Sequence, residues 1–158
     1  MDLLQSTDVT IRPFRQDDRE RVQAFFDQMG PESRGFFNRD RGNERGAMAF
    51  FTDGPTAEVE RFLAERNGRM IGYVFLFGND RRVPWLGIAV SEDAKGCHLG
   101  TRLMEFAKNY ALSHGKGGIL LTTHQANLRG QALYEKSGYV RLGNHTSGEV
   151  LYFLNFGE

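Results

Sequence analysis

The chain has 158 residues, of which 20 are Lys or Arg and 20 are Asp or Glu, so its formal net charge is zero. Hydrophobic residues make up 40% and charged residues 25%, a composition that excludes wholesale disorder and fits one globular domain over 1–158, with its core over about 9–156. Zero net charge gives no long-range field of one sign, which disfavours nucleic acid or a membrane surface as the main partner.

The single cysteine, Cys97, cannot form an internal disulfide. The sequence begins without a signal-peptide pattern, and its longest apolar runs are far shorter than the roughly 20 residues that span a bilayer. We therefore expect a cytoplasmic protein without a membrane segment.

The first third of the chain predicts one strand and one helix. β-forming residues predict a strand over 9–15. Apolar residues at helical spacing predict a helix over 17–29, which Asp17 and Glu20 would begin as a capping box. The polar segment 31–55 is expected to be a long connection with room for a short helix.

Three strands follow. Segment 58–66 fits a helix or a strand by itself, but the Asn-Gly pair at 67–68 before the β-prone run 70–77 is typical of a two-residue hairpin. The apolar run 85–90 predicts a central strand buried on both faces, and Gly87 is well placed for a bulge.

The last third predicts a helix over 100–113, which His114 and Gly115 close, and a strand over 119–123. Asn127 can begin a second helix that ends at Gly138. Two further strands, over 139–142 and 150–156, would form a hairpin. This order of elements predicts an α+β fold with a mixed sheet.

The loop over 95–100 joins strand 85–90 to the N-terminus of the following helix. Unpaired N–H groups and the positive end of the helix dipole meet at such a junction, which suits a phosphate. A tight turn that only lets the helix pack closely is an equally good interpretation. The loop is not a Walker motif, because no Gly-Lys-Ser/Thr follows.

A second motif runs from Asn127 through Leu133 and Tyr134 to Gly138 and Tyr139. Together with the strand 85–90 and the loop 95–100, it resembles the Gcn5-related N-acetyltransferase (GNAT) superfamily over roughly residues 9–156. The loop departs from that family's usual pattern at two positions. Lys95 occupies the usual Arg/Gln position, and His98 stands where the family generally has Gly, so we expect the His98 side chain to turn outward while its N–H still donates.

The resemblance implies a mostly antiparallel, twisted sheet of six to seven strands that splay apart between the fourth and fifth, with about four helices. It also implies an enzyme that transfers an acetyl group from acetyl-CoA to the amine of a small molecule or peptide by direct attack. The pyrophosphate would bind at the loop and helix N-terminus, and the pantetheine arm along strand 85–90. The implied cofactor-binding residues are Ile88, Ala89, Val90, Lys95, Gly96, Cys97, His98, Leu99, Gly100, Thr101, Asn127 and Tyr134.

Asn127 and Tyr134 are seven residues apart, so both face the same side of their helix. The resemblance gives Tyr134 the role of the acid that protonates the departing thiolate. Packing under the sheet is the alternative for Tyr134, and a helix cap is a sufficient role for Asn127.

The amine must lose a proton before it attacks, and neither strand 85–90 nor strand 119–123 carries an acid. His124 directly follows the second of these strands and is the candidate base, although a loop residue without a role is the simpler interpretation. Glu65 is a weaker candidate. Cys97 lacks the His and acid pattern of a nucleophile, and the four histidines lack metal-ligand spacing, so no metal is expected.

Two other functions stay open. One is a non-catalytic module that binds or senses acyl-CoA with the same fold, and the other is an unrelated nucleotide-phosphate binder. The sequence identifies neither the acceptor nor the oligomeric state, which could be monomer or homodimer.

Overall fold

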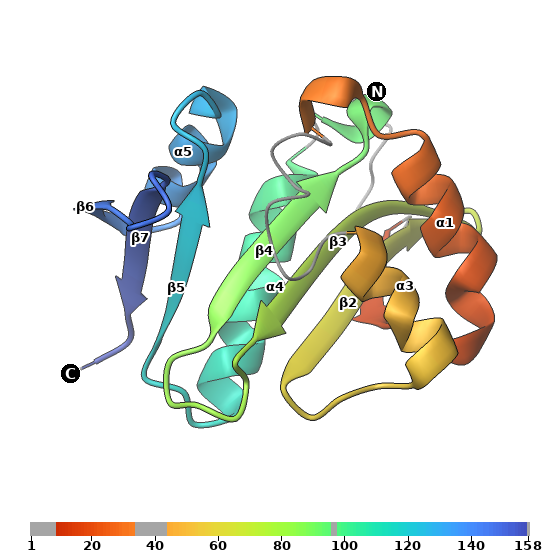
Figure 1. The fold of residues 1–158 in the computed structure, drawn as a ribbon, viewed down its shortest axis with the longest axis horizontal. Coiled ribbons are helices and arrows are strands. Elements are labelled where there is room, and N and C mark those ends of the chain that lie inside the picture. Colours follow the sequence, from red (N-terminus) through yellow and green to blue (C-terminus); the bar gives the residue numbers. More distant parts are fainter. Residues whose placement is uncertain (1–8, 34–43, 96–97, 158) are drawn as a thin grey trace.

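A computed structural model of the chain describes residues 9–33, 44–95 and 98–157. Its centre is a seven-stranded sheet in the order β1-β2-β3-β4-β5-β7-β6 (Figure 1). The strands are β1 (Thr10–Pro13), β2 (Val59–Arg66), β3 (Arg69–Phe77), β4 (Trp85–Val90), β5 (Gly118–Thr123), β6 (Val140–Asn144) and β7 (Val150–Asn155). The helices include α1 (Arg19–Asp27), α3 (Glu44–Asp53), α4 (Leu99–Ser113) and α5 (Leu128–Lys136), with short 3₁₀ turns η2 (Gln16–Asp18) and η3 (Glu92–Ala94).

Neighbouring strands are antiparallel except β4 and β5, which are parallel and paired only at Trp85 and Leu120. Beyond this pair the two strands diverge (Figure 1). Beyond Trp85 and Leu120, the N–H and C=O groups of β4 and β5 that face each other are therefore not joined by hydrogen bonds between these two strands. This confirms the predicted mixed, mostly antiparallel sheet that splays between its fourth and fifth strands.

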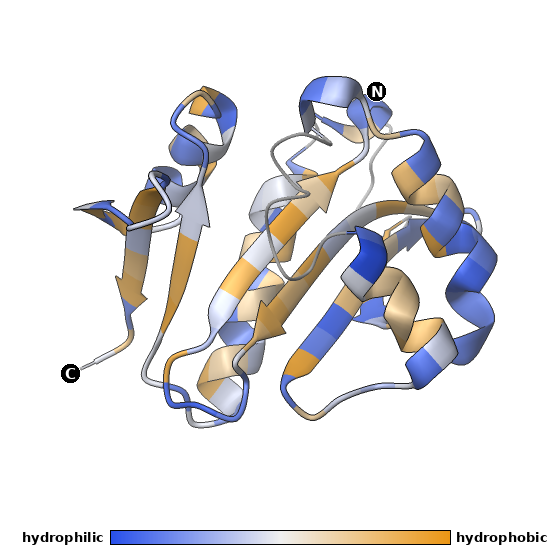
Figure 2. Ribbon diagram, viewed as in Figure 1, coloured by the Kyte–Doolittle hydropathy of each residue, from blue (hydrophilic) through white to orange (hydrophobic). Residues whose placement is uncertain are grey.

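Helices cover both faces of the sheet. Helix α4 lies on one face of β3 and β4, and α1 and α3 lie on the other (Figure 1). Figure 2 shows hydrophobic residues concentrated along β3 and β4, between these layers. A core with Leu103 and Tyr134 forms on the α4 face, and a second core rich in aromatic rings, among them Tyr73 and Phe75, forms on the α1 face.

The hairpin between β2 and β3 forms where the Asn-Gly pair predicts it. Asn67 has φ 54° and Gly68 has φ 75°, the left-handed conformations that a two-residue turn of this type requires. The bulge expected at Gly87 is absent, because the register of β3 with β4 is continuous there. Gly87 instead gives space to a neighbour: a Cβ at this position would overlap the ring of Phe75.

The start of α1 also differs from the prediction. Asp17 and Glu20 do not form the capping box; α1 begins after Asp18, whose buried carboxylate accepts a hydrogen bond from the Arg15 N–H at 2.7 Å. The same carboxylate binds the Arg12 guanidinium through two hydrogen bonds of 2.8 Å each. A buried ion pair between β1 and the helix start therefore takes the place of the predicted cap.

The short helix for which segment 31–55 has room is α3, ten residues long, in which Ala47 is buried in the second core. One further expectation needs correction. Strand β4 is central but not buried on both faces, since Leu86 and Gly87 are buried while its other four residues are half-exposed. The divergence of β4 from β5 explains this exposure, because it opens a cleft beside β4.

Candidate active site

A cleft with a volume of about 410 Å³ lies between β4 and β5 and extends to the N-termini of α4 and α5. We call it the splay cleft. Alternation along β4 places Ile88 and Val90 on the α4 face and Gly87 and Ala89 on the α1 face, yet all four line the cleft. The splay cleft is therefore accessible to groups on both faces of the sheet, as two reactants that meet inside it would require.

His98, which stands where the family generally has Gly, adopts a backbone conformation that Gly favours. His98 has φ 64° and ψ 14°, the left-handed conformation that Gly adopts without strain. Its side chain is exposed, and His is one of the residue types enriched in this conformation. Gly96 and Cys97 lie outside the described residues. The expected outward orientation of His98 agrees with its exposure.

Helix α4 approaches α5 closely at its first turn. A Cβ at Gly100 would lie 3.1 Å from Leu133 Cδ2 of α5, so a larger residue here must displace that side chain. Leu99, Gly100 and Thr101 all line the splay cleft, and the side chain of His98, the N-cap residue, makes no capping hydrogen bond. The first N–H groups of α4 and the positive end of its dipole are thus available to an anion in the cleft.

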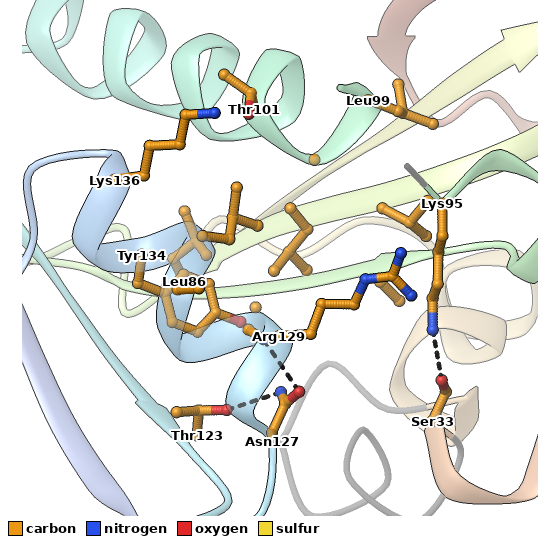
Figure 3. Close-up of a pocket in the computed structure, with 18 of the residues that line it drawn as sticks. Ser33, Leu86, Lys95, Leu99, Thr101, Thr123, Asn127, Arg129, Tyr134 and Lys136 are labelled. Atoms are coloured by element: carbon orange, nitrogen blue, oxygen red, sulfur yellow. Dashed lines mark hydrogen bonds between the residues drawn. The ribbon is translucent and has the colours of Figure 1, made fainter. Parts of the chain in front are cut away.

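Three cationic side chains line this end of the splay cleft: Lys95, Arg129 and Lys136. In Figure 3, the Lys136 ammonium points toward Thr101 and the Arg129 guanidinium extends toward Lys95. Lys95 Nζ donates hydrogen bonds to Ser33 Oγ at 2.9 Å and to the exposed Glu92 carboxylate at 3.1 Å. The bonds from Lys95 and Ser33 hold the pKa of Glu92 below its usual value, and the charge of Arg129 acts in the same direction.

Asn127 holds the β5–α5 junction together. Its Oδ1 accepts from the Gly130 N–H at 3.1 Å, the predicted helix cap, and its Nδ2 donates to Thr123 Oγ1 at 2.9 Å (Figure 3). Gly130 is needed here, because a Cβ would approach Asn127 Nδ2 to 2.5 Å. The cap is confirmed, and Asn127 also lines the splay cleft.

Tyr134 lines the same cleft from α5 (Figure 3). Its residue is only 6% exposed, and its ring packs edge-on against Tyr152 and tilted against Tyr139. Packing and access to the cleft therefore coexist at this residue. The Tyr139 hydroxyl is buried without a hydrogen-bond partner in the described part of the chain, and burial raises its pKa far above the usual value.

The two candidate bases have different surroundings. His124 lines the splay cleft, and its Nδ1 accepts the Ala126 N–H at 3.0 Å, so the neutral ring carries its proton on Nε2. Glu65 does not line the cleft; its carboxylate pairs with Arg12 at 3.1 Å, between β2 and the edge strand β1. Only His124 of the two is placed near the splay.

Most residues expected to bind a cofactor meet in the splay cleft. They are Ile88, Ala89, Val90, Lys95, His98, Leu99, Gly100, Thr101, Asn127 and Tyr134. The sequence analysis missed Ser33, Arg129, Lys136 and Glu149, which also line it. Helical periodicity did not predict Arg129 and Lys136, because each lies two residues beyond Asn127 or Tyr134, off the face that these two share. Ser33 and Glu149 belong to no motif.

Within the described ranges, no helix has both the length and the apolar content needed to cross a membrane. No three His, Cys, Asp or Glu side chains in those ranges gather to hold a metal ion.

The splay, the helix N-terminus beside it and the helix from Asn127 to Tyr134 agree with the family resemblance of the sequence. The model of the acetyltransferase (GNAT) family matches residues 23–139, most of the chain. The chain belongs to the GNAT family. An uncharacterized N-acetyltransferase of Bacillus subtilis, YhfO, is 29% identical over 93% of this chain and 97% of its own length.

Solved GNAT structures share the fold. The GNAT domain of S. lividans PAT superposes with a TM-score of 0.82 at 18% identity, over 94% of this chain and 90% of that domain. The spermidine N-acetyltransferase of Vibrio cholerae, solved with CoA and spermine, gives 0.75 at 16% identity, over 94% of both chains. At these identities the likeness establishes the fold and leaves the acceptor open.

Proposed function

We infer that this protein transfers an acetyl group from acetyl-CoA to a primary amine by direct attack within a ternary complex. The observation that carries this proposal is the splay cleft, which is open to both faces of the sheet between the α4 N-terminus and Tyr134. Membership of the GNAT family and the CoA-bound structure of a fold neighbour support it.

The cofactor would lie along β4. Its pyrophosphate would bind the first N–H groups of α4, with Arg129 and Lys136 as countercharges. The amides of its pantetheine arm would pair with the backbone of β4 beyond Trp85, where β5 no longer does so. This arrangement directs the thioester toward the deeper part of the cleft, where Tyr134 lies.

The reaction needs three proton transfers when the acceptor arrives as ammonium. His124 takes the first proton, which leaves a neutral amine, and its ring must exchange its hydrogen bond from Ala126 when it does so. The amine attacks the thioester carbonyl, and backbone N–H groups near Ile88 stabilise the developing oxyanion. The C–S bond then breaks, and Tyr134 gives its proton to the thiolate as it leaves. The excess proton on the amide nitrogen returns to Tyr134 and restores its hydroxyl.

Purified protein incubated with acetyl-CoA and a panel of amines, with thiol release followed, tests this function. We expect release with at least one amine, amino acid or N-terminal peptide. Acetyl-CoA should also raise Tm well above the shift from ATP or NAD at equal concentration, because a ligand of the folded state stabilises it by mass action. No release together with a clear acetyl-CoA shift would favour the non-catalytic module, and equal shifts from all three would remove the acetyl-CoA assignment.

Gly100→Val tests the phosphate site. The larger side chain meets Leu133 and crowds the first turn of α4, so we expect the Kd for acetyl-CoA to rise at least about tenfold, which corresponds to ~1.4 kcal/mol. Cys97→Ser, which exchanges one side-chain atom and keeps the main chain, is the control and should change Kd by less than about threefold. Calorimetric titration of both variants measures this. Unchanged Kd in both would mean that the loop is only a turn.

A further inference from the structure

One buried carboxylate in the splay cleft has no role in the mechanism above. Glu149 directly precedes β7, is only 8% exposed, and is the only acid among the described residues that line the cleft. Its neighbours fix its backbone: its C=O accepts the His145 N–H at 2.7 Å and its N–H donates to Ser147 Oγ at 3.3 Å. No hydrogen bond or ion pair from the described residues reaches its carboxylate.

The turn that carries Glu149 is anchored from two other elements. Gln125 Nε2 of the β5–α5 loop donates to the Gly148 C=O at 2.8 Å. The ring of His145 packs edge-on against Trp85 of β4, with ring centroids 5.9 Å apart. Contacts to both sides of the splay thus hold the turn in place, and with it the backbone of Glu149 at the cleft.

The Glu149 carboxylate lines the cleft without a countercharge from the described residues. A cation that enters the cleft would therefore meet an unshared negative charge and could form a charge-assisted hydrogen bond with it. An ammonium group suits the site better than a metal ion, which would need several oxygen ligands from the protein. An ammonium has three N–H donors. One can bind the Glu149 carboxylate and another the hydroxyl of Thr122, which also lines the cleft. The third can bind a backbone carbonyl of the splayed strands.

Charge divides the cleft into two regions. Lys95, Arg129 and Lys136 surround the α4 N-terminus, where phosphates would bind and an ammonium would be repelled. Glu149 lies on the β5–β7 side, since Thr123 of β5 pairs with the next residue, Val150. Val150 and Tyr152 of β7 face the α4 core. Side chains alternate between the two faces of a strand, so Glu149, one residue before Val150, lies on the opposite face of the sheet.

We propose that Glu149 binds the ammonium group of the acceptor, and that the acceptor is therefore an aliphatic primary amine that arrives protonated at neutral pH. This assignment rests on the proposed acetyl transfer and specifies its substrate class. Glu149 holds the ammonium at the acceptor face until it gives up its proton, and an amine that is uncharged at neutral pH lacks this contact.

Glu149→Gln keeps the shape of the side chain and removes its charge. For each protonated amine that releases thiol with the wild-type protein, we expect KM to rise at least about tenfold while kcat stays within about threefold, the pattern of lost ground-state binding. Aniline, which is uncharged at neutral pH, should be a poor acceptor compared with benzylamine, and its kcat/KM should not change in the variant. The Kd for acetyl-CoA should also be unchanged.

Glu105→Gln is the matched control, because Glu105 is exposed on α4 and does not line the cleft. It should leave KM for the amine unchanged. A fall in kcat at unchanged KM in Glu149→Gln would identify a proton-transfer role instead and overturn the assignment. Unchanged kinetics with protonated amines, or aniline accepted better than benzylamine by the wild-type protein, would overturn it as well.

A second measurement separates this assignment from the acetyl transfer itself. The Glu149 carboxylate has no hydrogen-bond or ion-pair partner among the described residues, so Glu149→Gln without ligand loses no contact and should have a Tm equal to or above that of the wild-type protein. A Tm several degrees lower would show that the carboxylate has a structural partner and would overturn the assignment, whether or not any amine is acetylated. Failure of every amine in the panel with the wild-type protein would instead contradict the proposed function.

Discussion

Tyr134→Phe is expected to lower kcat about 100-fold, within the usual range for the loss of a general acid. The ring contacts to Tyr139 and Tyr152 remain in the variant, because only the hydroxyl is removed. The Kd for acetyl-CoA should therefore change little. Steady-state thiol release with the best amine of the panel measures kcat, and titration with acetyl-CoA measures Kd.

Tyr139→Phe is the matched control for this experiment. The Tyr139 hydroxyl lies close to Tyr134 in the same core, but it is buried without a hydrogen-bond partner among the described residues. Its removal should leave kcat within about twofold and should not lower stability, because no hydrogen bond is lost. Full activity of Tyr134→Phe would reduce Tyr134 to a packing residue, and equal losses in both variants would point to a shared effect on the core.

The parts of the fold that local rules determine could be predicted from the sequence. The turn at Asn67 and Gly68, the cap at Asn127 and the end of α5 before Gly138 each depend on residues within a few positions of one another. The splay was expected only through the family resemblance. It arises because β4 and β5 pair at a single position, which depends on contacts between distant segments.

The failed expectations involve partners that are far apart in the sequence. Gly87 suggested a bulge, but its space is filled by the ring of Phe75 from the neighbouring strand. Asp17 and Glu20 suggested a capping box, but Asp18 binds Arg12 of β1 instead. Glu149 was missed because the sequence places it in a polar turn, and only the pairing of β7 with β5 brings it to the cleft.

Asp18→Asn is expected to destabilise the fold by about 3–5 kcal/mol, the usual cost of breaking a buried ion pair from one side. The Asp18 side chain is fully buried, and Arg12, whose side chain is 9% exposed, would keep its charge without the bidentate partner. Arg12 also binds Glu65 at 3.1 Å, so the loss would extend to the contact between β1 and β2. Denaturant unfolding measures the difference in free energy.

The same variant should lose part of the acid sensitivity of the wild-type protein. Burial alone would raise the pKa of Asp18, but hydrogen bonds from Arg12 and Arg15 and the charges of Arg12 and Arg21 hold that pKa below its usual value. A carboxylate with a lowered pKa in the folded state contributes its full stability above the unfolded pKa, about 3.9, and loses it as the pH falls through the folded value. The free energy of unfolding should thus fall more steeply below about pH 4 in the wild-type protein than in Asp18→Asn.

Asp93→Asn is the control for the stability loss, because the ion pair of Asp93 with Arg69, at 2.8 Å, is exposed and worth at most about 1 kcal/mol. Equal stability losses in the two variants would contradict a structural role for the buried pair, because the buried Asp18 has more partners to lose than the exposed Asp93.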